Sequence, residues 1–280
     1  MSKHLKIFNL KIKPIFTPSV FWLILALFFQ NCQEPTKGCL DIRATNFDVT
    51  ANNACPDNCC LYPNLKLQIS HFADTNIFNV GNKYKIGADS VQILQCQFYL
   101  SDFQLVTIDN KIATTTDSIN LIRQDDTKTV LNSFAVVSKN KGFSYNIGRF
   151  SSVGTYSEVR FKIGLNDEAN KAIPAKMPAN TPLSIQADSM YLPSQNGYIF
   201  NKIVIAKGQN FKDTVQYFVT TARDLKLKTP KNLVFTEGVD AVIPIRINYL
   251  AFFKNVNFAD SRNSILEKLV VNTDNVFSIQ

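Results

Sequence analysis

Apolar and polar residues alternate with a period of two along most of the chain after residue 61. In 158–165, the apolar residues Val159, Phe161 and Ile163 alternate with charged ones. This pattern is typical of a strand with one buried face. Comparable alternation predicts further strands at 65–71, 94–105, 198–205, 215–219 and 243–249.

Two of these strands carry more detailed predictions. In 94–105, the apolar residues Leu94, Cys96, Phe98 and Leu100 define one face, and Phe103 and Leu105 continue the apolar pattern beyond Asp102. In 243–249, Pro244 cannot donate a backbone hydrogen bond, which predicts an edge strand.

Only 264–271 has helical spacing, with Ile265, Leu266 and Leu269 on one side. Many short strands separated by frequent turn signals predict an all-β fold, an antiparallel sandwich or barrel-like single domain. We assign this domain to residues 61–280, about 220 residues, which is within the range of one all-β domain.

Residues 1–31 are predicted to be a signal peptide. Val20–Phe29 is an uninterrupted apolar run of ten residues that follows a lysine-rich stretch. A transmembrane helix needs about 20 residues, so this run is too short to span a bilayer. Cys32 follows the end of this run by three positions. It resembles the acylated cysteine of bacterial lipoproteins, with simple secretion as the alternative. We therefore expect an exported, lipid-anchored protein of the cell envelope, either periplasm-facing or on the cell surface.

Removal of this peptide changes the composition of the chain. The formal net charge of +8 falls to +4, because four lysines and no acidic residue are lost. A balance of this kind does not indicate nucleic-acid binding. Trp22 and His4 are lost as well, so the mature chain has no tryptophan and a single histidine, His71.

Four cysteines lie close together after the predicted anchor: Cys39, Cys55, Cys59 and Cys60. An exported chain meets an oxidising compartment, so disulfides are expected. A bridge between the adjacent Cys59 and Cys60 would be strained, which leaves two pairings open: Cys39–Cys60 with Cys55–Cys59, or Cys39–Cys59 with Cys55–Cys60. A zinc site is the alternative to disulfides. We interpret residues 32–60 as a stapled spacer between membrane and domain.

Two groups of oxygen-bearing residues are candidates for calcium. Asp41, Asn46 and Asp48 form one group, and the Asn-Asp-Glu-Ala-Asn run at 166–170 forms the other. Neither has the spacing of an EF-hand loop. Turn chemistry explains the first group equally well, and a solvated loop at a strand end explains the second.

Three blocks of sequence, in this order, resemble the MbnP-like copper-binding proteins, a family of exported bacterial β domains. They are Phe-Tyr-Leu-Ser-Asp at 98–102, Val-Gly-Thr-Tyr to Phe-Lys-Ile-Gly-Leu at 153–165, and the stretch from Thr-Pro-Leu to Gly-Tyr-Ile-Phe at 181–200. The resemblance implies a β domain that binds copper through histidines, in some relatives with an oxidised tryptophan.

The residues at the family's metal positions differ here: they are Lys171, Leu192, Ser194 and Phe218. The remaining Cu(I) ligand candidates are His71 with the soft sulfur of Met190 or Cys96. The alternatives are that His71 packs on the inner face of its strand, that Met190 fills space, and that Cys96 is a reduced, buried thiol. If His71, Met190 and Cys96 all have these packing roles, the metal site is reduced or lost.

The sequence carries no nucleophile elbow, P-loop, dinucleotide fingerprint or His-Glu-x-x-His motif, and we predict a protein without enzymatic activity. The proline-rich stretch 166–197 is either a binding mouth or an exposed excursion. We expect a non-enzymatic cell-envelope lipoprotein with an MbnP-like domain whose metal site is reduced or lost. The alternative is a lipid-anchored surface binding or adhesion module without metal. In both cases another envelope protein is the expected partner.

Overall fold

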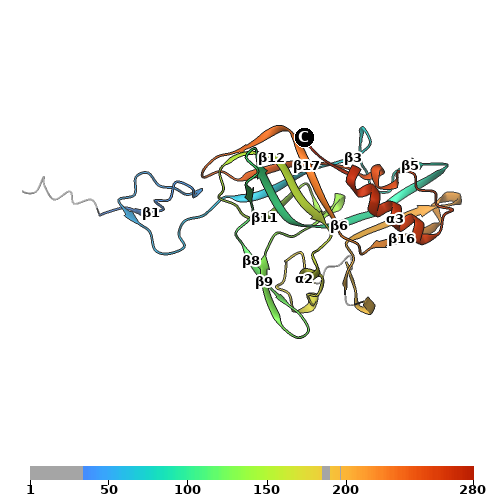
Figure 1. The fold of residues 1–280 in the computed structure, drawn as a ribbon, viewed down its shortest axis with the longest axis horizontal. Coiled ribbons are helices and arrows are strands. Elements are labelled where there is room, and N and C mark those ends of the chain that lie inside the picture. Colours follow the sequence, from blue (N-terminus) through green and yellow to red (C-terminus); the bar gives the residue numbers. More distant parts are fainter. Residues whose placement is uncertain (1–33, 185–189, 196) are drawn as a thin grey trace, which may run out of the picture.

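The structure is a computed structural model that describes residues 34–184, 190–195 and 197–280. Two sheets pack into an elongated β sandwich, with an N-terminal segment at one end and a lobe projecting from its side (Figure 1). Cys32 and the predicted signal peptide lie outside the described residues. The predicted division into 1–31, 32–60 and 61–280 therefore stays a prediction.

The larger sheet has eight strands and is built around one long strand, β6. Its main order is β16 (Asp213–Val219), β15 (Asn201–Lys207), β6 (Asp89–Thr107), β12 (Gly154–Ile163) and β17 (Arg223–Phe235). Three shorter strands also pair with β6: β5 (Lys83–Ile86), β7 (Ile112–Ala113) and β10 (Ala135–Ser138). Every pair in this sheet is antiparallel.

The smaller sheet has five strands. Its order is β11 (Ser144–Arg149), β3 (Asn64–Ala73), β18 (Ala241–Asn248) and β19 (Phe277–Ile279), with β4 (Asn76–Ile77) also paired to β3. The β3–β18 pair is parallel, and the other pairs are antiparallel. The predicted all-β sandwich with mainly antiparallel sheets is confirmed.

The prediction that the Pro244 strand lies at an edge is wrong. β18 has β3 on one side and β19 on the other. Pairing with β19 covers only Ile245–Ile247, and the carbonyl oxygen of Pro244 accepts from the Gln280 amide at 3.1 Å. The missing N–H therefore falls where the ladder ends, so an interior strand tolerates proline here.

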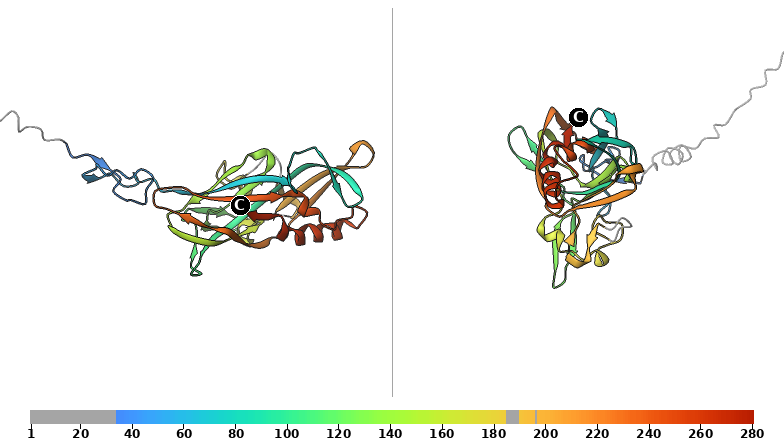
Figure 2. Two further views of the ribbon diagram at one scale, coloured as in Figure 1. Left: turned by 90° about the horizontal axis from the view of Figure 1, so that it is seen from above. Right: turned by 90° about the vertical axis from the view of Figure 1, so that its right-hand side faces the viewer.

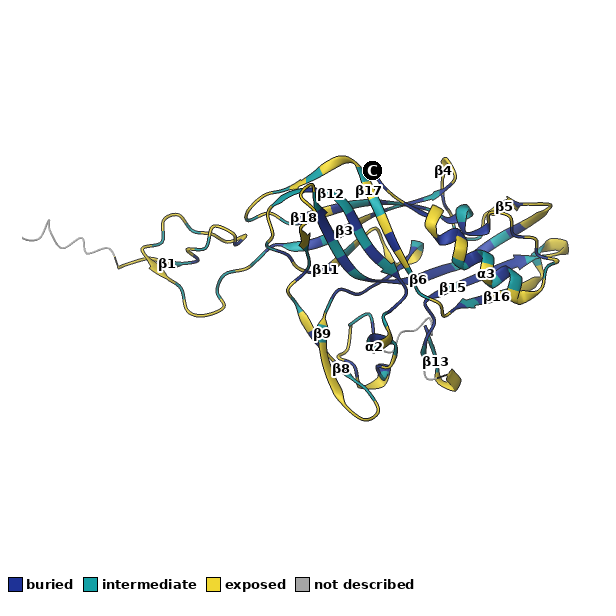
Figure 3. Cartoon of the chain, viewed as in Figure 1, coloured by how far each residue is buried: buried dark blue, intermediate teal, exposed yellow. Residues whose placement is uncertain are grey.

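The main core fills the space between the two sheets, and the predicted alternation accounts for it. Leu65, Leu67 and Ile69 of β3 face Val159 and Phe161 of β12 across the sandwich, all nearly inaccessible to water. Figure 3 shows the same alternation of buried and exposed positions along the strands.

Strand β6 changes its inward face twice, because it contains two bulges. One lies between the pairs Val204–Gln95 and Ile205–Ile93, and it turns Leu94 outward, with 36% exposed. The predicted inward position of Leu94 is therefore wrong. The second bulge lies at Asp102, which has φ +56°, and it returns Phe103 and Leu105 to the core as predicted.

The helix predicted at 264–271 is α3 (Arg262–Asn272), which buries Ile265 and Leu269. It is not the only helical element, because α2 (Asp167–Asn170) forms one turn where a strand-end loop was predicted. The remaining helical pieces are short 3₁₀ turns: η1 (Lys139–Lys141), η2 (Pro174–Lys176), η3 (Pro193–Gln195), η4 (Gln209–Phe211), η5 (Tyr249–Phe253) and η6 (Thr273–Asn275).

The side lobe consists of the described residues of two stretches, 118–134 and 165–200. It contains the hairpin β8 (Ser118–Ile122) with β9 (Thr127–Leu131), together with α2, β13 (Tyr191–Leu192) and β14 (Gly197–Tyr198). A second hydrophobic cluster fills it, separate from the main core.

The N-terminal segment, residues 34–61, forms a small unit of its own. It contains the parallel strands β1 (Lys37–Gly38) and β2 (Asn53–Ala54). Its buried apolar residues are Cys39 and Ala44, too few for a core, so disulfides stabilise it. Figure 2 shows the segment continuing the long axis of the sandwich.

Candidate functional site

The base of the side lobe is held by the residues of the family-like blocks. The amide of Gly164 donates to the carbonyl of Tyr99 at 2.8 Å, and the Ser101 hydroxyl donates to the carbonyl of Gly164 at 2.9 Å. The Asn166 side-chain amide donates to the Asp102 carboxylate at 2.9 Å. The Tyr-Leu-Ser-Asp block therefore fixes the point where the chain leaves β12 for the lobe.

Glycine is required at position 164. Its φ is +108°, and a Cβ placed there would lie 2.8 Å from the Phe200 ring. Phe200 belongs to the third block, so the second and third blocks meet at this glycine.

Two tyrosines of the blocks then hold the proline-rich stretch. The Tyr99 hydroxyl donates to the carbonyl of Pro182 at 3.1 Å, and the Tyr198 hydroxyl donates to the carbonyl of Leu183 at 2.7 Å. Their rings pack edge to face at 5.6 Å. The Asn170 side chain accepts from the Tyr198 amide at 2.8 Å and ties α2 to the β13–β14 hairpin.

Four residues occupy the positions that the resemblance matches to the family's metal ligands, three in the side lobe and Phe218 on β16. Leu192 and Phe218 are half-buried against the second hydrophobic cluster, whereas Lys171 and Ser194 are exposed. Leucine and phenylalanine have no lone pair for a metal, and a protonated lysine repels a cation. These residues do not fit a copper ion.

Met190 lies in the same cluster, which explains its burial without a ligand. It is 2% exposed and packs with Met177 and with the aliphatic and aromatic residues of the lobe. Its carbonyl accepts from the Ile199 amide at 2.9 Å. His71 hydrogen-bonds Tyr249, which belongs to the main core cluster in the sandwich, so Met190 and the His71 partner lie in different clusters.

His71 lies on β3 with 7% of its surface exposed, and both ring nitrogens have partners. Nε2 is 3.2 Å from the carbonyl of Gly142, and Nδ1 is 2.8 Å from the Tyr249 hydroxyl. A carbonyl only accepts, so Nε2 carries the proton and Nδ1 accepts from Tyr249. Burial lowers the pKa of His71, and its hydrogen bond to Gly142 opposes this in part. The imidazole is therefore neutral at pH 7, with no nitrogen left for a metal.

Cys96 lies on the inner face of β6 as a free, buried thiol, 4% exposed. Burial raises the pKa of this thiol far above its usual value. Because thiolate is the form that ligates metals and reacts with electrophiles, Cys96 acts as a small apolar residue of the core.

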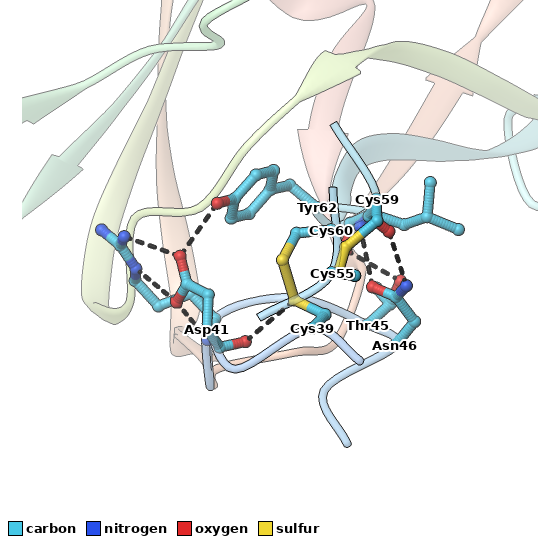
Figure 4. Close-up of a disulfide and its surroundings, with 10 residues drawn as sticks. Cys39, Asp41, Thr45, Asn46, Cys55, Cys59, Cys60 and Tyr62 are labelled. Atoms are coloured by element: carbon cyan, nitrogen blue, oxygen red, sulfur yellow. Dashed lines mark hydrogen bonds and ion pairs between the residues drawn. A yellow bond between two sulfur atoms is a disulfide. The ribbon is translucent and has the colours of Figure 1, made fainter. Parts of the chain in front are cut away.

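The four clustered cysteines form two disulfides, Cys39–Cys60 and Cys55–Cys59 (Figure 4). This is one of the two pairings left open by the sequence. The sulfurs of Cys55, Cys59 and Cys60 lie within 4.8 Å of one another and are the one metal-sized group of His, Cys, Asp or Glu side chains among the described residues. All three are engaged in disulfides, so the zinc alternative does not fit.

The oxygen atoms considered for calcium serve the local fold instead. Asp41 accepts from the Arg43 guanidinium and from the Tyr62 hydroxyl at 2.9 Å, and the Arg43 hydrogen bonds are the main reason why the pKa of Asp41 is low. Asn46 donates to the carbonyl of Cys59 at 2.8 Å and accepts from the Leu61 amide at 2.7 Å. These contacts are visible in Figure 4.

The carboxylates of Asp48 and Glu168 are also paired. Asp48 accepts from the amide and hydroxyl of Thr50. Glu168 of α2 pairs with Arg123 and with Lys128, the latter at 3.2 Å, and so binds α2 to the β8–β9 hairpin. Turn and capping chemistry therefore accounts for both groups.

Within the described ranges, no helix has the length and hydrophobicity needed to cross a bilayer. The predicted acylation of Cys32 falls outside those ranges.

Comparison with known proteins identifies the family. No curated protein matches the sequence. The structure is similar to that of MbnP from Methylosinus trichosporium, with a TM-score of 0.44 and 14% sequence identity, covering 69% of this chain and 78% of that chain. The MbnP family model matches residues 62–268, which are well over half of the sequence. The chain therefore belongs to the MbnP family.

Proposed function

We propose that the protein is a non-enzymatic lipoprotein of the cell envelope, anchored through Cys32, whose MbnP domain has lost the copper site that the family resemblance implies. The domain then serves as a scaffold that presents the side lobe to a partner in the envelope.

The observation that carries this proposal is the pairing of both His71 nitrogens inside the sandwich. Copper binding by His71 would require the imidazole to give up Tyr249 or Gly142 and to turn out of the core. A buried hydroxyl or carbonyl left without a partner costs about 1–3 kcal/mol. Neither of the two sulfurs considered repays this cost. Met190 packs in another cluster, and Cys96, in the same core as Tyr249, is a buried thiol whose pKa is raised by burial.

The anchor is supported by the sequence and by the place of the N-terminal segment. A lysine-rich stretch, a ten-residue apolar run and then Cys32 have the order of a lipoprotein signal. The described chain begins at Glu34, and its first segment continues the long axis of the sandwich (Figure 2). An anchor at Cys32 would hold this end of the molecule toward the membrane.

The second candidate function, a surface binding or adhesion module without metal, is favoured by a groove between the side lobe and the sandwich. The groove has a volume of about 480 Å³, within the 300–1,000 Å³ of typical ligand sites. One wall comes from the proline-rich stretch, Asn180–Pro182 and Ser184, and the other from Phe134–Val136 and Ser144–Asn146.

Metal content tests the main proposal. The native lipoprotein, purified from membranes without chelators, should contain far less than one copper per chain by elemental mass spectrometry. Its N-terminal peptide should carry acyl chains on Cys32, and Cys32→Ala should abolish both acylation and membrane recovery. Stoichiometric copper would contradict the loss of the metal site, and an unmodified N-terminus downstream of Cys32 would contradict the anchor.

The adhesion function requires exposure on the cell surface. Protease added to intact cells should then cleave the protein. Full protection in intact cells, with cleavage after lysis, would place the domain in the periplasm and exclude adhesion.

A further inference from the structure

The N-terminal segment exposes several large apolar side chains. Five of its large apolar residues are at least 41% exposed: Leu40, Ile42, Phe47, Val49 and Leu61. Val49 is 82% exposed, the highest value among the exposed large apolar side chains of the described chain. Exposed large apolar side chains that gather into one patch mark an interaction site.

The adjacent end of the sandwich adds to this surface. Val153 and Val239, exposed by 48% and 58%, lie on the loops after β11 and after β17. These two residues line one small cavity together with Arg43 of the N-terminal segment. Two more exposed apolar residues lie at the same end: Val234 of β17, 65% exposed, and Ile108 just after β6, 60% exposed. The two strands end there side by side with the start of β12, where Thr107 pairs with Tyr156 and Phe235 with Gly154.

We propose that the N-terminal segment lies on the lipid bilayer, with Val49 and its exposed apolar neighbours inserted at the membrane interface. This inference rests on the proposed anchor at Cys32, and it adds an orientation: the segment contacts lipid, and the far end of the sandwich points away.

The length of chain between anchor and segment supports lipid as the occupant. Cys39 follows Cys32 by seven positions, and the stretch spans at most about 25 Å when fully extended. The first disulfide, Cys39–Cys60, then holds both ends of the segment together. The segment is therefore confined next to the bilayer, where apolar side chains can enter the boundary between headgroups and acyl chains, about 5–10 Å deep.

Charge indicates that this contact is apolar rather than electrostatic. The segment carries two basic residues, Lys37 and Arg43, and four acidic residues, Glu34, Asp41, Asp48 and Asp57. Anionic lipids would repel such a segment. Binding should therefore occur on zwitterionic vesicles and should change little with salt concentration.

The composition of the mature chain allows a direct test. The mature protein has no tryptophan, because Trp22 lies in the predicted signal peptide. A single introduced tryptophan is then the only one in the protein. We would place it at Val49 (Val49→Trp) and, as a matched control, at Val271 (Val271→Trp), which is 60% exposed. Val271 is a residue of α3, the helix that lies away from the N-terminal segment in Figure 1.

The full lipoproteins are reconstituted into phosphatidylcholine vesicles, with or without bromine on the acyl chains. The expected result is blue-shifted emission of Val49→Trp that is quenched by the brominated lipid, and water-like, unquenched emission of Val271→Trp. Unquenched, water-like emission of Val49→Trp in protein that floats with the vesicles overturns the proposal. Emission that shifts to the blue only as the protein density rises, without quenching by lipid, also overturns it and assigns the surface to a second copy of the chain.

Failure of the anchor gives a different result. If the signal peptide stays on the chain, wild-type protein shows the emission of Trp22. If Cys32 is not acylated, wild-type protein does not float with the vesicles.

Discussion

Replacing His71 distinguishes a structural role of this histidine from a role as a metal ligand. In the structure, the imidazole joins β3 to the Tyr249 hydroxyl at 2.8 Å and to the carbonyl of Gly142 at 3.2 Å. We predict that His71→Ala leaves the domain folded but less stable, and that most of the loss depends on Tyr249.

The magnitude follows from the groups left behind. The Tyr249 side chain is fully buried, so its hydroxyl would lose its partner at a cost of about 1–3 kcal/mol. The lost ring leaves a partly filled cavity that adds about 1 kcal/mol. The total of about 2–4 kcal/mol is less than the 5–15 kcal/mol of a typical domain, so the variant should still fold.

A double-mutant cycle with Tyr249→Phe measures the coupling. Urea unfolding of the wild type, the two single variants and the double variant should give an interaction free energy of about 1 kcal/mol or more. The control cycle pairs His71→Ala with Tyr156→Phe, whose hydroxyl donates to the carbonyl of Ser152, away from His71; this coupling should be close to zero. Equal coupling in both cycles would refute the hydrogen-bonded pair.

Three further predictions concern pH, a glycine and the thiols. Burial lowers the pKa of His71 below its ordinary value of 6.5. Below pH 6.5 the unfolded chain therefore binds a proton that the folded chain resists, so the free energy of unfolding falls as the pH drops toward the folded pKa, and above pH 6.5 the effect is absent. The pH dependence of unfolding of His71→Ala should lack this part of the slope. Gly164→Ala should destabilise the domain by about 2–5 kcal/mol in urea unfolding, because it combines backbone strain with a clash against Phe200. The control Gly142→Ala, with nearly the same φ and no atom within 4 Å of the added Cβ, should cost only about 1–2 kcal/mol. Equal losses would contradict the packing argument. Thiol titration of the mature lipoprotein should find no reactive thiol in the native state, one thiol after unfolding, that of Cys96, and five thiols after unfolding and reduction. Reduction should leave the melting temperature of the β domain nearly unchanged. A second thiol in the unfolded, unreduced protein would contradict the two disulfides.

The sheets could be predicted from the sequence because their positions follow local alternation. Val159, Phe161 and Ile163 face the core as expected, and the buried thiol of Cys96 is confirmed. The phase change at Asp102 was visible as well, since Phe103 and Leu105 break the earlier alternation. The MbnP family, inferred from three short blocks, is confirmed.

Other features depend on contacts between distant parts of the chain and were not predictable. The outward position of Leu94 results from a bulge opposite β15, which lies more than a hundred residues later. Pro244 is tolerated in an interior strand because the β19 ladder covers only Ile245–Ile247 of β18.

The environment of the candidate ligands also depends on distant contacts. That Met190 packs in a different cluster from Tyr249, the partner of His71, depends on how the side lobe folds on β6. The partners of His71, Tyr249 and Gly142, are both distant in sequence. The sequence signal for a packed histidine was its place after Leu65, Leu67 and Ile69 on one face of a strand.

A Cu(I) competition titration tests most directly whether this MbnP domain has lost its copper site. The reduced metal is titrated against a chromophoric chelator in the presence of wild type, His71→Ala and the near-isosteric Met190→Leu, with the disulfides intact. We predict that all three compete weakly and equally, because both imidazole nitrogens are engaged and the thioether lies in another cluster. Stoichiometric, sub-nanomolar binding by wild type that is lost in His71→Ala would contradict the account and restore copper handling as the function.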